Sequence, residues 1–442
     1  MSDSATKATP QPAATDGKSD EEAEAIAFLR ALIAAQRDGE DAVQALIAGK
    51  MQEAGAQVEN RPYEPAEVPV IGEFASSKAQ RAGTRVNVIG RLEGDPARRS
   101  LLMFAHPDSE PVAGLETWAH DPFAGTIEDG RLYGWGVADD LAGIAVGALA
   151  VARAARAGVA LGDVAMVSAP SKRHARGVAA AMHQGLVADA ALYLHPAESG
   201  VGLNEIKAFA AGQLEFRITV RGKFPPTNEP GHTAFAHLAI NPIDKAVVIH
   251  AALRRLDAAR GARITHPALE REVGRSTNIL ISNMICGEEY KLGRLNETCA
   301  LSGAISFPPG ETLEQVKAEV EAAIAEACAA DPWLAENPAE IDWLTGVTGA
   351  ECPPDHPLYR TAARAVEEST GSTPHVNPMH TSSDIRNPIV QKAIPTVGLG
   401  GLCGDLTQNG RHDEWIDVAD YLRTISATTA IVLDWCGAPR AG

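Results

Sequence analysis

Positive charge is scarce in this chain of 442 residues, which has 39 lysine and arginine residues against 57 aspartate and glutamate residues. The net charge of −18 argues against nucleic acid or an anionic membrane as a partner, because phosphate groups are bound by clustered basic side chains. No apolar run is long enough to span a membrane, and the first residues lack the basic-then-apolar order of a signal peptide. We therefore interpret the acidity as a contribution to solubility.

Cysteine is also sparse, and its placement excludes two kinds of small scaffold. All six cysteines lie beyond residue 285, and no two of them form a CxxC pair. This pattern fits neither a disulfide framework nor a structural zinc ribbon, so we expect a protein of the reducing cytoplasm. The sequence also shows no internal repeat.

The chain does contain enough apolar sequence for two domains, because 45% of its residues are hydrophobic. Residues 1–19 are small and polar and include prolines, so we expect them to be disordered. From residue 86 to residue 195, short apolar runs alternate with helical patterns. This alternation predicts an α/β domain with a parallel-type mixed sheet covered by helices.

The pattern changes at Leu214. The segment LEFRITVRG alternates apolar and polar residues with period two, as in an antiparallel strand with one solvated face. Further strand and helix patterns continue to residue 346 and predict an α+β unit inserted into the first domain. We therefore expect a catalytic domain formed by residues 20–211 and 347–442, with a lid formed by residues 212–346.

Two polar residues follow the apolar and glycine-rich segments of the first domain. His106 comes directly after the apolar run 101–105, and Asp139 ends a glycine-rich turn before a helical pattern. Ligands bind at the carboxyl ends of strands in open α/β sheets, so the two side chains can converge. Imidazole and carboxylate suit zinc or manganese, with Asp108 placed to orient the imidazole. The alternative is a histidine at a strand end, capped by an aspartate without a metal.

Four ordered segments carry a family resemblance. They are FAHPDSEP, DPFAGTIEDGRLYGWGVADD, GHTAFAHLAINPIDKA and TSSDIR. Over roughly residues 25–435 the chain resembles the dinuclear-zinc amidohydrolases and peptidases that include carboxypeptidase G, aminoacylase and succinyl-diaminopimelate desuccinylase. The resemblance implies a ferredoxin-like lid that also serves dimerisation, and hence a homodimer or higher homo-oligomer.

The resemblance also implies roles for individual residues. His106 would bind the first metal, Asp139 would be the carboxylate that bridges two metals, and Asp108 would hold His106. His232 would match the lid histidine that reaches into the partner subunit's active site and hydrogen-bonds the developing oxyanion, a kind of donor that lowers the barrier by a few kcal/mol. The alternative for His232 is an ordinary surface histidine in a loop.

The sequence departs from the family pattern at the second metal. Ser171-Lys172 stands where the family has two glutamates, a general base and a metal ligand, and residues 168–177 contain no acidic residue at all. A protonated lysine cannot bind a cation, and serine cannot replace a carboxylate base. Gly410 occupies the position of the family's second-metal histidine, although His412 lies nearby.

Two further departures concern the first metal and the substrate. His195 stands at a position where the family has an acidic ligand, and imidazole in place of carboxylate preserves metal binding. A buried histidine without a metal is the alternative for His195. The family arginine that binds a substrate carboxylate is replaced by Ser306, so substrate recognition must differ.

These features favour a hydrolase with one divalent metal per subunit, manganese or zinc, bound by His106, Asp139 and His195. Its substrate would be a small acidic molecule in which metal-activated water cleaves a C–N bond, for example an aromatic amine such as 5-nitroanthranilate, which would lose its amine. The candidate proton carriers are His174, Glu110 and Glu198. Two alternatives stay open. The first is a dinuclear aminoacylase, desuccinylase or peptidase, and the second is a non-catalytic binding protein on the same scaffold.

Overall fold

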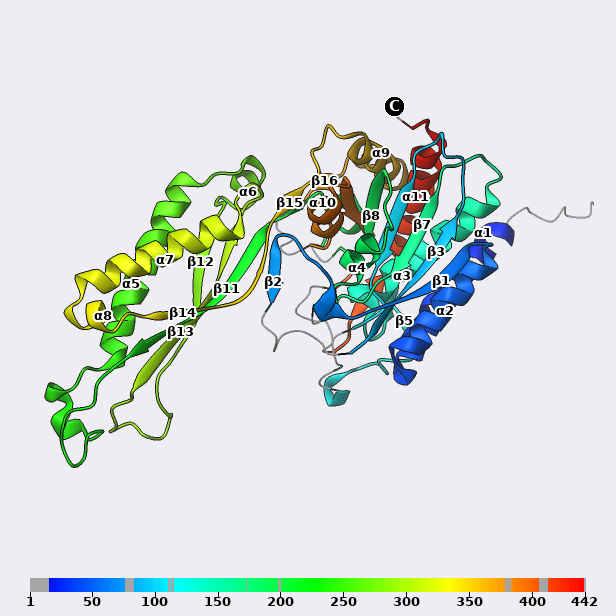
Figure 1. The fold of residues 1–442 in the computed structure, drawn as a ribbon. Coiled ribbons are helices and arrows are strands. Elements are labelled where there is room, and N and C mark those ends of the chain that lie inside the picture. The colour runs from blue at the N-terminus through cyan, green and yellow to red at the C-terminus, as the bar shows by residue number, and fades with distance from the viewer. Residues whose placement is uncertain are drawn as a thin grey trace, which may run out of the picture.

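The computed structural model describes residues 16–75, 83–109, 112, 115–172, 174–197, 200–377, 383–404 and 412–440. Two separate sheets organise these residues, one of six strands and one of five, and Figure 1 shows them in two adjacent bodies. Each sheet packs against helices through its own buried hydrophobic clusters. The mixed α/β class is as expected, while the exact domain boundaries stay a prediction.

The six-stranded sheet positions the site. Its strands, in spatial order, are β1 (Gln57–Tyr63), β3 (Arg85–Leu92), β7 (Val164–Ser168), β4 (Leu101–Ala105), β8 (Ala190–Leu194) and β17 (Thr396–Leu399). The four strands from β7 to β17 are parallel, whereas β1 and β3 are antiparallel to their neighbours. The chain reverses after β3 because residues 93–100 are too few for a crossover, which takes a dozen or more residues.

Helices cover both faces of this sheet. One buried cluster joins it to α1 (Asp16–Ala35), α2 (Glu40–Glu53), α3 (Ala142–Arg156), α9 (Pro357–Thr370) and α11 (Val418–Gly437). Another cluster joins the opposite face to α4 (Gly177–His183) and to Ile385 and Ile394, which flank α10 (Arg386–Lys392). The expectation that residues 1–19 are disordered was wrong for residues 16–19, which belong to α1. Residues 1–15 lie outside the described part of the chain.

Among the described residues, three small sheets flank the central one. A three-stranded sheet contains β18 (Trp415–Asp417), β6 (Arg131–Tyr133) and β5 (Thr126–Glu128), and a parallel pair contains β9 (Glu205–Ile206) and β16 (His375–Val376). The strands β10 (Phe209–Ala210) and β15 (Ala350–Glu351) form an antiparallel pair where the chain enters and leaves the lid.

The lid contains the five-stranded sheet, which is antiparallel throughout. Its strands, in spatial order, are β12 (Asn278–Ile285), β13 (Thr298–Phe307), β11 (Gly212–Arg221), β14 (Glu340–Val347) and β2 (Glu73–Ala75). Buried and less buried residues alternate along β11, as its period-two sequence predicts. The long helices α5 (Pro242–Arg263) and α7 (Leu313–Ala330) pack on this sheet, and the short helices are α6 (Pro267–Glu272) and α8 (Pro332–Glu336).

The edge strand β2 comes from the catalytic half of the sequence and was not expected in the lid. It pairs with β14, so that Glu73 lies opposite Val347. The preceding residue Ile71 exchanges two hydrogen bonds with the Gln391 side chain of α10, at 3.2 and 3.1 Å. We call residues 71–75 the strap, because they contact both bodies.

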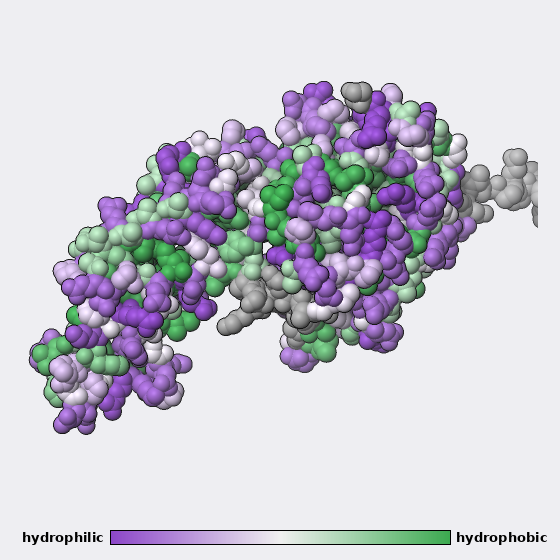
Figure 2. All heavy atoms as spheres, viewed as in Figure 1, coloured by the Kyte–Doolittle hydropathy of each residue, from purple (hydrophilic) through white to green (hydrophobic). Residues whose placement is uncertain are grey.

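The part of the lid between β11 and α5 lies at the end remote from the catalytic sheet (Figure 1). Hydrophilic residues cover most of the face seen in Figure 2, which agrees with the acidic composition. None of the helices in the described ranges combines the length and hydrophobicity that a membrane span needs.

Candidate active site

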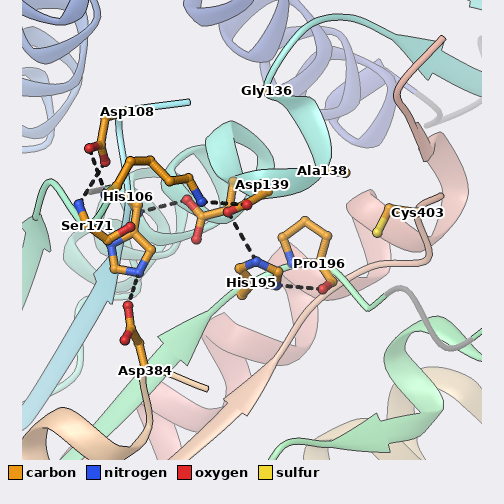
Figure 3. A network of polar contacts seen from close by, with 12 residues as sticks. His106, Asp108, Gly136, Ala138, Asp139, Ser171, His195, Pro196, Asp384 and Cys403 are labelled. Carbon is orange, nitrogen blue, oxygen red and sulfur yellow. Dashed lines mark hydrogen bonds and ion pairs between the residues drawn. The ribbon is translucent and has the colours of Figure 1, made fainter. Parts of the chain in front are cut away.

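Polar side chains from four segments meet at one edge of the six-stranded sheet (Figure 3). His106 follows β4, Lys172 follows β7, and His195 follows β8. These three strands are parallel neighbours, so their carboxyl ends lie together. Asp139 joins them from the irregular turn that precedes α3. The convergence of His106 and Asp139 on one region follows the rule that ligands bind at the carboxyl ends of strands.

Asp139, Asp140 and His195 form a buried group of metal-ligand type, in which one ligand atom of each lies within 4.8 Å of the others. Nε2 of His195 lies 3.4 Å from Oδ1 of Asp139. Oδ1 of Asp140 accepts the backbone N–H of His106 at 2.8 Å, whereas Oδ2 is buried without a hydrogen-bond partner among the described residues. Burial of a carboxylate oxygen without a hydrogen-bond partner destabilises the folded protein. The group therefore fits one divalent cation.

Lys172 is placed on the other oxygen of Asp139. Its Nζ lies 2.5 Å from Oδ2 of that carboxylate, and both side chains are largely buried. Burial by itself raises the pKa of Asp139, but the Lys172 ammonium and the His195 ring outweigh it, so the pKa lies well below its usual range. For Asp140, burial is the main cause that raises the pKa, and the adjacent Asp139 charge adds to it. The pKa values of the two neighbouring carboxyls are thus shifted in opposite directions, so that the ionised form of Asp139 and the protonated form of Asp140 are favoured.

His106 is buried but does not join the group formed by Asp139 and His195. Its Nδ1 lies 2.7 Å from the carbonyl oxygen of Ala169, and its Nε2 lies 2.8 Å from Oδ2 of Asp384. Burial alone would lower the pKa of His106, but the acidic partners raise it to about 9. The predicted ligand set of His106, Asp139 and His195 is therefore not assembled in this structure, because Asp384 pairs with the ring nitrogen of His106 that would face a metal.

The predicted role of Asp108 also needs correction. Its two carboxylate oxygens accept the backbone N–H groups of Ser171 and Lys172 at 2.8 and 2.9 Å, and Arg85 donates to it at 3.1 Å. Asp108 therefore positions the turn that carries Lys172 and does not hold the ring of His106. A carboxylate that accepts two successive backbone N–H groups fixes the conformation of that turn.

Glu414 fixes the turn that carries Asp139. This buried carboxylate accepts the backbone N–H groups of Gly136, Ala138 and Asp139 at 2.9, 2.7 and 3.2 Å. The pairing of β18 with β6 brings Glu414 to this turn. Glu414 therefore supports Asp139 through its backbone.

A cleft of about 330 Å³ opens beside His106 and Lys172. Its lining residues also include Glu73, Ser171, His174, Arg176, Val347, Asp384, Arg386 and Asn387. Since Val347 belongs to the lid strand β14, the cleft lies between the two bodies. His174 is half-buried, and burial lowers its pKa. Besides His106 and Lys172, the described residues that line the cleft thus include the titratable side chains of His174, Asp384 and Glu73.

The remaining predicted residues lie elsewhere. His232 is exposed, and its Nδ1 accepts the N–H of Ala234 at 3.0 Å in the remote end of the lid. His412 is exposed as well. Glu110, Glu198 and Gly410 lie outside the described residues.

Three residues of the site were missed by sequence reasoning. Asp140 is adjacent to Asp139, so the paired aspartates of VADD were an available signal. Asp384 lies in TSSDIR, a segment used for the resemblance without a role for its aspartate. Glu414 stands two residues after His412, at the glutamate of the family's C-terminal motif, but its contact with a backbone turn far away in sequence could not be predicted.

Comparisons with known proteins show the family and the fold of the chain. The profile of Peptidase family M20/M25/M40 matches residues 102–434. A succinyl-diaminopimelate desuccinylase of Gluconobacter oxydans is 29% identical over 61% of this chain and 66% of its own length, just under two thirds. The same enzyme of Xanthobacter autotrophicus is 26% identical over 89% of this chain and 92% of its own. The M20 family metallo-carboxypeptidase Sso-CP2 of Sulfolobus solfataricus shares the fold, with a TM-score of 0.67 and 15% identity, covering 93% of this chain and 98% of that one.

The fold and the buried site define a two-body metallohydrolase. More specifically, the chain belongs to peptidase family M20/M25/M40, a family of metal-dependent amidohydrolases.

Proposed function

We propose that this protein is a hydrolase that uses one divalent metal ion, zinc or manganese, to cleave a C–N bond in a small acidic substrate. The observation that carries the proposal is the 2.5 Å contact between Lys172 Nζ and Asp139 Oδ2. An ammonium at this distance opposes a second cation beside the same carboxylate. The group formed by Asp139, Asp140 and His195 is left for one ion.

The protein's own residues divide the work around that ion. When bound, a divalent ion supplies Lewis-acid activation of water at neutral pH. Asp139, Asp140 and His195 would hold it, and Lys172 and Glu414 keep Asp139 in place. A proton can be held on Nε2 of His106, which faces Oδ2 of Asp384, or on the ring of His174, and both histidines line the cleft.

For the substrate, we propose an electron-poor aromatic amine such as 5-nitroanthranilate. In that reaction water replaces the ring amine, which leaves as ammonia, and the ring gains a hydroxyl group. The loss of the family's glutamate base at Ser171-Lys172 supports this choice, because such a leaving group needs less assistance than a peptide amine. The second candidate is hydrolysis of an N-acyl amino acid, and the similarity to two succinyl-diaminopimelate desuccinylases supports it.

We also propose that the protein forms a homodimer through the lid. Apolar side chains are exposed on the edge strand β12, at Leu280 and Ile285, and on α5, at Ile243 and Val247. Exposed apolar groups on an open sheet edge are typical of an interface. A partner subunit would also explain how His232, remote from its own cleft, could contribute to a site.

The test combines elemental analysis with a substrate screen. We expect one divalent ion per chain, no activity after chelation, and recovery when zinc or manganese is added, with aminobenzoates and N-acyl amino acids as test substrates. The change His195→Ala should remove both metal and activity, whereas the matched change of the exposed His412→Ala should leave the metal bound. Two ions per active chain, or full activity after rigorous chelation, would contradict the proposal. Metal binding without turnover of any substrate would favour a binding protein.

A further inference from the structure

Lys207 is completely buried next to the metal-ligand group, and the proposed chemistry does not use it. It lies between β9 and β10, with an exposed fraction of 0%. Its Nζ donates to the carbonyl oxygens of Pro196 and His195, at 2.7 and 3.2 Å, and lies 2.8 Å from Nδ1 of His195. Burying an ammonium costs several kcal/mol, which these contacts must offset. A residue needed only for packing would not require this charge.

The backbone of Lys207 is anchored to the central sheet. Its N–H donates to the carbonyl oxygen of Gly398 at 2.8 Å, and the N–H of Gly398 donates back at 2.7 Å. Gly398 belongs to β17, and a Cβ atom at this position would lie only 3.0 Å from the Cβ of Lys207. Glycine therefore allows the close approach that brings the lysine to His195. The side chain thus extends from a fixed backbone position to His195 and Pro196.

The contacts of His195 link Lys207 to Asp139, the next member of the metal-ligand group. Nδ1 of its ring lies 2.8 Å from the carbonyl oxygen of Pro196 and 2.8 Å from Nζ of Lys207, and Nε2 lies 3.4 Å from Oδ1 of Asp139. A neutral ring that presents Nε2 to a cation carries its hydrogen on Nδ1, which donates to the Pro196 carbonyl oxygen. Lys207 donates to that same oxygen and to the carbonyl of His195, so it fixes the acceptor that orients the imidazole. Groups that hold a ligand histidine through its second nitrogen affect metal affinity strongly.

We propose that Lys207 is a positioning residue, which holds the ring of His195 so that Nε2 faces Asp139. The role of that ring as a metal ligand rests on the proposed function, whereas the hold of Lys207 on the ring does not. The positive charge itself opposes a nearby cation. The two effects of Lys207 therefore have opposite signs and can be separated by experiment.

The first test measures the affinity of the metal-free protein for Zn²⁺ and Mn²⁺. We expect Lys207→Met to weaken binding by about 10–100-fold, the usual range for such residues, with a lower kcat and little change in KM. Lys207→Gln keeps an N–H donor without the charge, so we expect it to lie closer to the wild type. The matched control is Lys245→Met, which removes a lysine of the lid that pairs with Asp331 and should leave affinity unchanged. Equal or tighter ion binding in Lys207→Met would overturn the proposal.

The second test does not depend on metal. Among the ring ¹⁵N signals of the 13 histidines, those of His195 are identified by their loss in His195→Ala. In the ion-free protein, Lys207→Met should move the Nδ1 signal of His195, and Lys245→Met should not. An unmoved signal would overturn the proposal, and if Lys207→Met fails to fold, the Lys207→Gln protein decides in its place. If the wild type binds no ion while the signal moves, the proposed function fails and the positioning role stands.

Discussion

Nζ of Lys172 and Oδ2 of Asp139 are 2.5 Å apart, while Oδ1 of the same carboxylate faces His195. One oxygen of Asp139 thus contacts the ammonium of Lys172, and the other faces the imidazole of His195, a side chain that can bind a metal. The resemblance implies that the corresponding carboxylate bridges two metals. We propose that in this chain an ammonium takes the place of one of them.

Removal of that ammonium should reduce activity. We expect Lys172→Met to lower kcat by about 10²–10³-fold, the usual loss when a fixed electrostatic group is removed from an active site. The ion content should stay at one per chain, because the lost glutamate ligand is not restored. Elemental analysis and steady-state kinetics check both points, with the exposed Lys291→Met as the control. Unchanged kcat would show that Lys172 has no part in catalysis.

Removal of the Glu414 carboxylate should affect both stability and metal binding. In Glu414→Ala three buried N–H groups of residues 136–139 lose their acceptor, so the free energy of unfolding should fall by about 2–4 kcal/mol. The affinity for a divalent ion should fall as well, because Asp139 is then less well held. Urea unfolding and ion titration measure the two effects. The exposed Glu336→Ala serves as the control, and equal stability of the two variants would contradict the role of Glu414.

If the lid forms the dimer interface, a charged residue placed in that interface should weaken the dimer. We expect a dimer in analytical ultracentrifugation, and Ile285→Asp on the exposed edge of β12 should shift it toward the monomer. His232→Ala should lower turnover strongly without changing either dimer formation or metal content. A fully active wild-type monomer in solution would rule out this arrangement.

Acid should weaken the lid through Glu319. This carboxylate accepts from the fully buried Arg260 at 2.6 Å and from Arg263 at 2.7 Å, and although burial acts in the opposite direction, the two arginines lower its pKa. A carboxylate with a pKa lowered in the folded state stabilises the protein above its unfolded pKa of about 4.3, and this contribution is lost as the pH falls through the lower, folded-state value. Glu319→Gln should therefore reduce the free energy of unfolding at pH 7 and flatten its dependence on pH between 6 and about 3. An identical pH profile for both proteins would disprove the contribution.

The sequence predicted elements where a repeating pattern reflects burial. The period-two strand β11 and the apolar strand β4 were found because each residue's environment follows from its position along one element. The three residues of β2 were missed, because their pairing depends on β14, far away in the chain. For the same reason Lys207 could not be recognised, since nothing in the letters distinguishes a buried lysine from an exposed one.

Within the site, strand order predicted that His106 and Asp139 converge, and His195 was added through the family resemblance. The sequence did not predict that His106 pairs with Asp384, or that Asp108 binds the turn at Lys172. These outcomes depend on side-chain rotamers and on competition among several acceptors, which no spacing rule describes.

The strap limits how the lid can turn. The two covalent connections to the lid lie side by side in the β10–β15 pair, and two adjacent connections by themselves define an axis of rotation. The strap adds a third attachment beside that pair, because β2 is hydrogen-bonded to β14 while Glu73 pairs with Arg386 at 2.7 Å and Arg176 at 3.2 Å. Any rotation must break these buried ion pairs or separate β2 from the lid sheet. The width of the cleft beside Lys172 is thus coupled to whether one glutamate keeps its two arginines.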